Sequence, residues 1–231
     1  MKDEKYDSME LYRILRKLSK RDILKYSKMK CEHRHSLISH PKCLLKELGK
    51  VDRIGYLDIE TSNLDANAGF ITSYCIKVRG EKKIYGRTIT KEEILSGDFD
   101  KQIVKDLCED LKNFDTVVGY YSTGFDIPYI RTQAVHHGID FPVYSTVKHI
   151  DVYYMIKHRF KLTRNRMQTA CDYFGIPSKG HALTPNWWKL AAIGDKKALA
   201  WTWEHNVEDV ISLELLHNKV SSYVKETNKS I

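Results

Sequence analysis

Long apolar runs are missing from this 231-residue sequence, in which no stretch approaches the roughly 20 apolar residues of a membrane span. The segment from Met1 to Lys5 lacks the apolar core of a secretory signal. Cysteine is scarce as well, and the five cysteines are an odd number that does not suit a disulfide framework. These absences argue against membrane proteins and disulfide-stapled secreted proteins. We therefore expect a cytoplasmic protein without a membrane partner.

Internal repeats and low-complexity segments are also missing, whereas hydrophobic residues make up 42% of the chain, which is enough to build a core. The net charge of +8 is unevenly distributed, because residues 1–50 contain 14 Lys and Arg against 7 Asp and Glu. We therefore divide the chain into a basic N-terminal extension, residues 1–50, and a globular domain, residues 51–231. The extension is either a solvated basic segment without a ligand or a segment that attracts nucleic acid.

The order of apolar patterns predicts the fold class. Apolar residues at positions 11, 14, 15 and 18 have helical spacing within a helix predicted at residues 8–28. Three β-branched and aromatic stretches in succession predict strands, and patterns for helices and a further strand follow them. The strands are predicted at 53–59, 70–78, 83–89 and 116–121, and the later helices at 99–113, 127–137 and 204–224. This order predicts an α/β protein whose mixed sheet opens with an antiparallel meander and is flanked by helices.

Two carboxylates lie at the end of the first predicted strand. Asp58 and Glu60 are two residues apart, so both side chains emerge on the same face of the strand. Two like charges this close resist ionising together unless a cation lies between them. Carboxylate oxygens are ligands of hard divalent ions such as Mg²⁺ and Mn²⁺, so the pair indicates a metal site.

Two further motifs add acids to the candidate site. Asp126 follows the strand at 116–121, in a glycine-containing turn before a helix. It can cap this helix, contribute to a ligand site at the edge of the sheet, or do both. His205 and Asp209 are four residues apart and share one face of the last predicted helix. By themselves they indicate either a surface hydrogen bond or a site.

Taken in order, the motifs Asp58-x-Glu60, Gly-Phe-Asp126-x-Pro and His205-Asn-x-x-Asp209 resemble those of the DEDD 3′–5′ exonucleases in the ribonuclease H-like superfamily. The resemblance covers residues 51–222. It is strongest to small stand-alone members of phages and prokaryotes, akin to the proofreading domains of DNA polymerases. It implies a ribonuclease H-like mixed sheet and an enzyme that hydrolyses phosphodiester bonds at the 3′ end of DNA or RNA, with DNA favoured. It also implies the cytoplasm of a prokaryote or of a phage-infected host cell, and a replication or repair protein as partner.

The resemblance implies roles for the residues of these motifs. Four acids would hold two Mg²⁺ or Mn²⁺ ions about 4 Å apart, which would activate a water and stabilise the leaving 3′ oxygen. These acids are Asp58, Glu60, Asp126 and Asp209. His205 would orient or deprotonate the water. The chain departs from the family here, because members have a tyrosine four residues before the last aspartate or a histidine five before it, whereas His205 has the tyrosine spacing. The resemblance therefore bears more directly on the metal ligands than on the base.

A second group of metal-binding residue types lies in the N-terminal extension. Two thiols and three imidazoles fall within 13 residues, a density that suits one tetrahedral, structural Zn²⁺. The candidate ligands are Cys31, one of His33 and His35 (His33 in the preferred set), His40 and Cys43. A short polar peptide has little other reason to fold. The alternatives are a basic, His-rich surface loop that touches nucleic acid and a coincidence of composition.

A basic stretch at residues 157–166 contains five Lys and Arg and no acid. Beside a metal centre it could follow a phosphate backbone, with Phe160 as a stacking platform. The alternative is a solvated connector between helices. The candidate nucleic-acid contacts are Thr61, which follows Glu60, and Lys157, Arg159, Phe160, Lys161, Arg164 and Arg166.

The remaining cysteines and the tryptophans fall within strand or helix patterns. We expect the cysteines to pack in the core. We expect the tryptophans to pack in the core or between helices rather than to serve as platforms for bases. These residues are Cys75, Cys108, Cys171, Trp187, Trp188, Trp201 and Trp203.

Three functions are compatible with these patterns. The first is a metal-dependent 3′–5′ exonuclease. The second keeps the metal site but cuts at internal or structured positions, because ribonuclease H-like folds host both chemistries. The third is a nucleic-acid-binding module without catalysis, which docks through its N-terminal segment. All four acids stand at matching places, which favours an enzyme over the silent module.

Overall fold

The computed structural model describes residues 18–31, 33–48, 53–144, 146–177, 184–224 and 229–230. The chain forms two compact units that divide between residues 52 and 53. Residues 8–17 of the predicted N-terminal helix lie outside the described residues. The remainder of that prediction is observed as helix α2.

In the smaller unit, helix α2 spans Lys20–Lys28 and helix α3 spans Pro41–Glu47. Helix α2 begins with a capping box, in which the Ser19 hydroxyl accepts from the Asp22 amide and the Asp22 carboxylate accepts from the Ser19 amide. Between the helices, Lys30 and Ser36 pair in a short antiparallel bridge. The apolar core is small. Among residues of this unit whose burial is described, the buried apolar side chains are Leu37, Cys43 and Leu44.

The larger unit is built on a mixed sheet whose described strands have the order β3-β2-β1-β4-β5-β6. Strands β1, β2 and β3 are antiparallel neighbours, whereas β4 and β5 run parallel to β1, and β6 is antiparallel to β5. The strands are β1 Ile54–Thr61, β2 Ile71–Val78, β3 Ile84–Thr88, β4 Thr116–Gly119, β5 Lys148–Asp151 and β6 Lys229–Ser230. This topology confirms the predicted mixed sheet that opens with an antiparallel meander.

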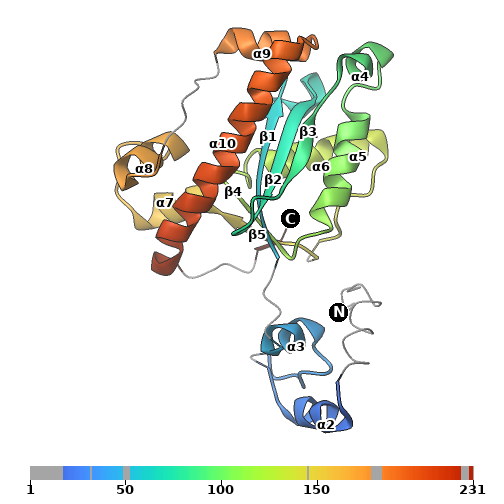
Figure 1. Cartoon of the computed structure of the whole chain (residues 1–231), viewed down its shortest axis with the longest axis vertical. Coiled ribbons are helices and arrows are strands. Elements are labelled where there is room, and N and C mark those ends of the chain that lie inside the picture. The colour runs from blue at the N-terminus through green and yellow to red at the C-terminus, as the bar shows by residue number, and fades with distance from the viewer. Residues whose placement is uncertain are drawn as a thin grey trace. The chain divides into compact units, whose positions relative to one another are not determined.

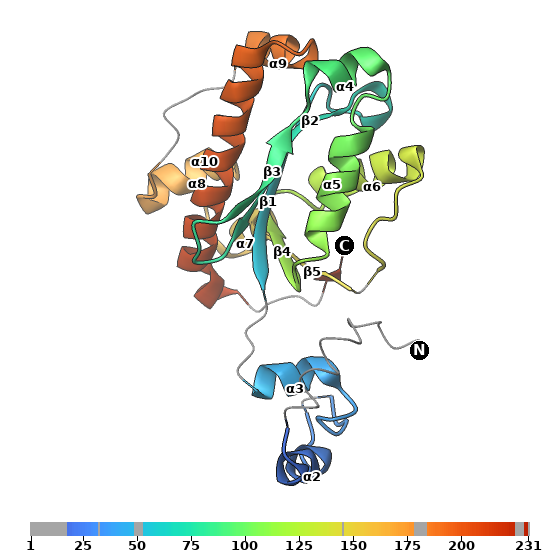
Figure 2. The ribbon, with the colours of Figure 1, turned by 45° about the vertical axis from the view of Figure 1, so that its right-hand side comes forward.

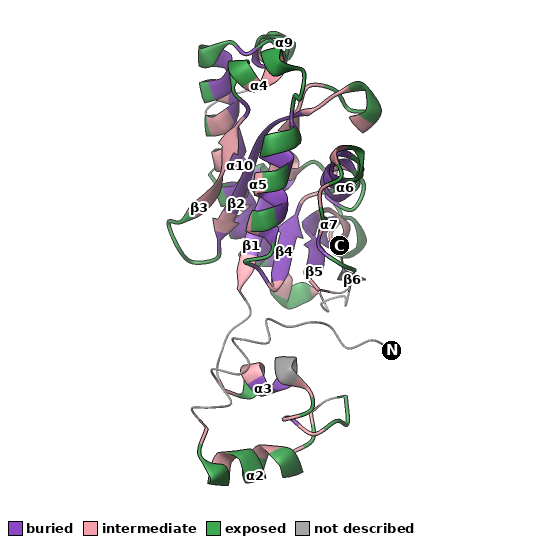
Figure 3. Cartoon of the chain, turned by 90° about the vertical axis from the view of Figure 1, so that its right-hand side faces the viewer, coloured by how far each residue is buried: buried purple, intermediate pink, exposed green. Residues whose placement is uncertain are grey.

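Helices cover both faces of this sheet, as Figures 1 and 2 show. Helices α5 and α6 pack on one face, against a core that includes Leu57 and Ile59 of β1. Helices α7, α8 and α10 pack on the other face, against a core that includes Tyr56 of β1 and Cys75 of β2. Figure 3 shows β2 and β4 buried between these layers, whereas β3 is only partly buried. The helices are α4 Lys91–Ser96, α5 Lys101–Leu111, α6 Asp126–His137, α7 Val152–Arg159, α8 Met167–Phe174, α9 Pro185–Ala192 and α10 Lys196–Val220, with 3₁₀ turns at Ala66–Ala68 and Ser221–Tyr223.

Helix α10 is the longest described element and begins earlier than the sequence predicts. It spans Lys196–Val220 instead of 204–224. The start is set by Asp195, whose carboxylate accepts a 2.9 Å hydrogen bond from the amide of Ala198. Of the helices in the described ranges, none has the length and apolar character to cross a bilayer.

Candidate active site

The parallel strands of the larger unit end at one edge of the sheet, and acids gather there. Asp58 and Glu60 lie in the last four residues of β1. Asp126 follows β4 after a turn, and Asp151 ends β5. The register places Asp151 beside Gly119, the last residue of β4. Because α/β proteins bind ligands at the carboxyl ends of their strands, this edge is the candidate site.

Asp58 and Glu60 lie on the face of the sheet that α10 covers. They pair with Cys75 and Ser73 in the register with β2, so these side chains share one face. Burial raises the pKa of the Cys75 thiol, and the carboxylates of Asp58, Asp209 and Glu60 raise it further. Three of the four predicted metal-ligating acids therefore lie near Cys75 of β2. They are Asp58, Glu60 and Asp209.

Asp126 is the most buried of the predicted ligands, with 4% of its surface exposed. It is the first residue of α6 rather than its cap, and its Oδ1 accepts a 3.2 Å hydrogen bond from the amide of Ile59, between the two acids of β1. Burial raises the pKa of Asp126 to about 7, and the charges of Asp151 and Asp209 add to this effect. A bound cation would stabilise the charged form of such a carboxyl group.

Helix α10 brings His205 and Asp209 to Glu60. The Nε2 atom of His205 lies 3.6 Å from Oδ2 of Asp209 and 3.7 Å from Oε1 of Glu60. One ligand atom from each of the three residues lies within 4.8 Å of the other two. The group draws on β1 and α10, which are far apart in the sequence, and it brings the carboxylates of Glu60 and Asp209 close enough to share a cation.

Two residues that the sequence analysis did not assign to the site donate hydrogen bonds to its acids. Nδ2 of Asn206 lies 2.8 Å from Oδ2 of Asp58, and Nε1 of Trp188 lies 3.1 Å from Oε2 of Glu60. Asn206 was detectable, because it lies inside the last motif, directly after His205. In the structure its side chain is fully buried, where an amide needs a partner. Trp188 carried no such signal.

The expectation that the tryptophans are packed in the core holds for part of the set. Trp187 stacks on Trp201 with ring centroids 5.2 Å apart, and Trp203 packs against one core cluster. Trp188 is the exception and the prediction for it was wrong, because it is 40% exposed and reaches Glu60. The predicted core cysteines of the larger unit are all buried. They are Cys75, Cys108 and Cys171.

Asp151 shapes the turn that leads into Asp126. Its carboxylate accepts hydrogen bonds from the amides of Tyr121, Thr123 and Tyr153, at 2.8, 2.8 and 3.0 Å. Tyr121 has a left-handed backbone with φ of 60°, which these bonds help to hold. Asp151 thus uses both oxygens to fix the backbone beside the site.

The sequence matches a known family across this region. Residues 55–221 match the profile of a family described as the RNase_H superfamily. The chain belongs to the RNase_H superfamily. No curated protein matches this chain. The matched range contains every predicted catalytic residue and the basic stretch, and it leaves out the N-terminal unit.

Among solved structures, this RNase_H superfamily chain is similar to the family B DNA polymerase from the hyperthermophilic archaeon Pyrobaculum calidifontis. The TM-score is 0.59 and the sequence identity is 20%. The match covers 74% of this chain and 25% of the polymerase chain, so the protein spans about a quarter of that relative's length. At this identity the likeness supports the fold.

The predicted nucleic-acid contacts of the superfamily domain lie mainly on one exposed segment. Five basic residues are exposed in the last turns of α7 and in the segment after it. They are Lys157, Arg159, Lys161, Arg164 and Arg166. The Tyr120 hydroxyl donates a 2.7 Å hydrogen bond to the carbonyl of Asn165, which ties this segment to the end of β4. The basic stretch therefore adjoins the turn that precedes Asp126.

The two uncharged candidates for nucleic-acid contact are differently placed. Phe160 is partly buried and packs against one core cluster, with its ring centroid 5.3 Å from that of Phe174 and 5.9 Å from that of Tyr223. Thr61 ends β1, and its hydroxyl donates a 2.8 Å hydrogen bond to the carbonyl of Asn63.

The predicted zinc ligands are brought together in the smaller unit, where His35 is not part of the group. They are Cys31, His33, His40 and Cys43.

Proposed function

We propose that this protein is a metal-dependent 3′–5′ exonuclease that hydrolyses phosphodiester bonds by a two-metal-ion mechanism. The observation that carries the proposal is the convergence of Glu60, His205 and Asp209 within 4.8 Å, beside Asp58 and the buried Asp126. These residues come from three separate motifs and meet at the carboxyl edge of a superfamily sheet. The same motifs, in the same order, resemble those of the DEDD exonucleases.

The donor set fits Mg²⁺ or Mn²⁺, because these ions prefer hard oxygen ligands to soft thiolates. The ligands would be Asp58, Glu60, Asp126 and Asp209. Without a cation, four grouped carboxylates would repel one another. Burial is the main cause of the raised pKa of Asp126, and the charges of Asp151 and Asp209 add to it, so a cation would relieve both effects. Bound there, the ions would supply an activated water and stabilise negative charge on the phosphate and the leaving oxygen.

The chain's own residues position the acids and provide a proton acceptor. Asn206 and Trp188 each donate to one acid of β1, which restricts the orientation of that carboxylate. His205 lies between Glu60 and Asp209, where its imidazole could accept a proton from an attacking water. The basic stretch at 157–166 would carry the phosphate backbone of the substrate.

Within this proposal DNA is the favoured polymer, and a replication or repair protein is the favoured partner. The similarity of the fold to part of a DNA polymerase supports both choices. Comparing the digestion of DNA with that of RNA would test the choice of polymer.

The test is digestion of linear single-stranded DNA and RNA of one sequence, labelled at the 5′ end, with Mg²⁺ or Mn²⁺. We expect a ladder that shortens from the 3′ end, and no products with EDTA or with Asp58→Ala. A closed circle of the same DNA should stay intact. Cleavage of the circle would indicate the alternative endonuclease. Salt-sensitive binding without cleavage that survives Asp58→Ala would indicate the silent binding module.

The unusual spacing of His205 gives a separate prediction. His205→Ala should lower kcat by roughly 100-fold, which is typical of losing a general base, and should alter the pH–rate profile. His205→Tyr places the family's tyrosine at this spacing, so it should recover part of the rate. Mn²⁺ affinity, measured by calorimetry, should change little in either variant. A His205→Ala variant with the wild-type pH profile would contradict the assigned role.

A further inference from the structure

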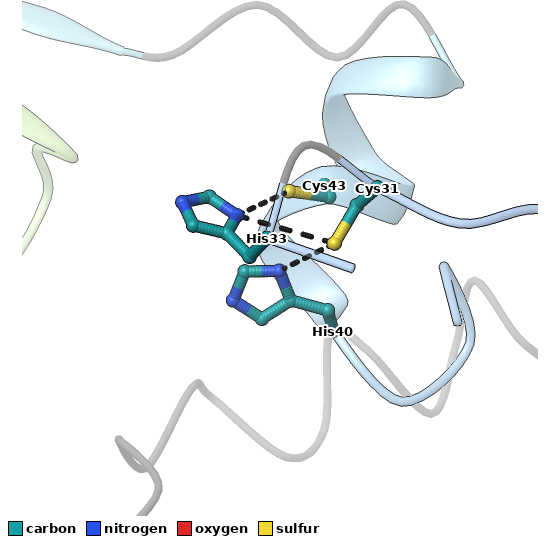
Figure 4. Close-up of side chains that lie close together, drawn as sticks. All are labelled: Cys31, His33, His40 and Cys43. Carbon is teal, nitrogen blue, oxygen red and sulfur yellow. Dashed lines mark hydrogen bonds between the residues drawn. The ribbon is translucent and has the colours of Figure 1, made fainter. Parts of the chain in front are cut away.

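We infer that the smaller unit contains a structural Zn²⁺ site formed by Cys31, His33, His40 and Cys43. Figure 4 shows the two sulfur atoms and the two imidazole rings turned toward one another. One ligand atom from each residue lies within 4.8 Å of the other three. Two thiolates and two imidazoles are a common ligand set of structural zinc. This site is independent of the proposed nuclease centre.

The distances between the ligand atoms agree with tetrahedral zinc. Nδ1 of His40 lies 3.3 Å from Sγ of Cys31, and Nδ1 of His33 lies 3.5 Å from Sγ of Cys43 and 3.9 Å from Sγ of Cys31. Zinc–sulfur bonds of about 2.3 Å and zinc–nitrogen bonds of about 2.0 Å at tetrahedral angles give a separation of about 3.5 Å. The observed values bracket this separation.

The backbone presents the ligands from two segments. Cys31 and His33 belong to a tight hairpin, in which the Cys31 amide donates to the His35 carbonyl at 2.9 Å and the Arg34 amide donates to the Cys31 carbonyl at 2.8 Å. Arg34 adopts a left-handed φ of 66°, which closes the turn. A metal held by all four ligands would join this hairpin to the second segment.

The second segment is the start of helix α3. His40 directly precedes α3, and Cys43 is its third residue. The Leu44 amide donates a 3.1 Å hydrogen bond to the His40 carbonyl, so the backbone holds this end of the helix in place. His35 lies on the hairpin but is exposed, and its ring meets the edge of the His40 ring at 5.3 Å instead of joining the group.

A metal that cross-links these two segments would compensate for the small apolar core of this unit. The described part of this unit has 30 residues, and its core consists of Leu37, Cys43 and Leu44. Chains below about 40 residues usually need a metal, a disulfide or a partner to fold. Zinc would supply that stabilisation, and its binding would release the two thiol protons to solvent. The inferred role is therefore structural.

The test uses the full chain, reduced, loaded with Zn²⁺ and freed of excess metal. Elemental analysis should find one zinc per chain in the wild type and in His35→Ala. Cys31→Ser and Cys43→Ser should each weaken zinc affinity by at least roughly 100-fold. Replacement by Co²⁺ should give visible bands of tetrahedral cobalt together with a thiolate charge-transfer band. The cobalt experiment needs no variant, so it stands even if the serine variants fail to fold.

Several results would overturn the inference. One is a reduced wild-type chain that retains no zinc, and another is a cobalt spectrum without the thiolate band. Mass spectrometry that finds a Cys31–Cys43 disulfide would assign the cysteines a different role. Asp209→Asn should keep the cobalt spectrum unchanged. If the wild type lacks the thiolate band and Asp209→Asn also loses the remaining visible bands, the metal lies in the carboxylate group instead.

Discussion

Replacing Asp209 by asparagine is expected to lower kcat for hydrolysis at a 3′ end by at least about 1,000-fold, equivalent to about 4 kcal/mol of transition-state stabilisation. Asparagine keeps the shape of the side chain but removes the charge that a divalent ion requires. The same change relieves repulsion with Glu60, so the melting temperature in EDTA should stay equal or rise. We would measure kcat, Mn²⁺ affinity and melting temperature on one preparation.

Glu204→Gln is the matched control for this substitution. Glu204 lies on the same helix and is exposed, and it does not belong to the group formed by Glu60, His205 and Asp209. Its kcat should stay within about twofold of the wild type, as is usual for an exposed surface position. Full activity in Asp209→Asn would contradict the ligand assignment. An equal loss in both variants would point to damage of α10 instead.

Four of the six described strands were predictable because each carries its own local signal, whereas the shorter pairings of β5 and β6 were not predicted. β1, β2, β3 and β4 are β-branched or aromatic runs bounded by turn residues, and they appear where the pattern places them. The start of α10 was missed because its signal is a single cap, Asp195, and not a long apolar period. Boundaries set by one hydrogen bond are hard to read from apolar spacing alone.

The same distinction holds for the candidate site. Asp58, Glu60, Asp126, His205 and Asp209 could be named as candidates because a motif holds each of them at a local spacing. The contact of Trp188 with Glu60 joins residues 128 positions apart, so no local pattern encodes it. Phe160 shows a further limit of local patterns. Its basic neighbours suggested a stacking platform, whereas the sequence did not indicate that its ring is partly buried and packs against Phe174 and Tyr223.

Asp126→Asn is expected to stabilise the metal-free protein at pH 8, by on the order of 4 kcal/mol. Burial raises the pKa of Asp126 in the folded protein to about 7, from an ordinary value of 3.8. Between these two values the folded chain binds more protons than the unfolded chain, so the contribution of Asp126 to stability falls as the pH rises. Asparagine avoids this loss and can still accept the hydrogen bond from the Ile59 amide. Denaturant unfolding in EDTA from pH 4 to pH 8 measures the effect.

The difference in unfolding free energy between Asp126→Asn and the wild type reports on Asp126 alone. Burial lowers the pKa of His217 to about 4, so His217 removes stability as the pH falls from 6.5 toward 4, which is the opposite trend. This term is common to both proteins and cancels in the difference. Asp100→Asn is the control, because its buried carboxylate accepts from the Ile71 amide and from His137, and its loss should destabilise the fold.

Saturating Mn²⁺ at pH 8 should make the wild type more stable than Asp126→Asn, which reverses the order of stability expected in EDTA. The ion binds the folded wild type and stabilises it by mass action, whereas the variant lacks one charged ligand and gains little. The unfavourable charge of Asp126 in the metal-free protein would then be the same charge that binds the metal. A variant that is less stable than the wild type at pH 8 in EDTA would show that the charge of Asp126 does not destabilise the metal-free protein, because asparagine keeps the hydrogen bond from the Ile59 amide. That result would contradict the raised pKa of Asp126.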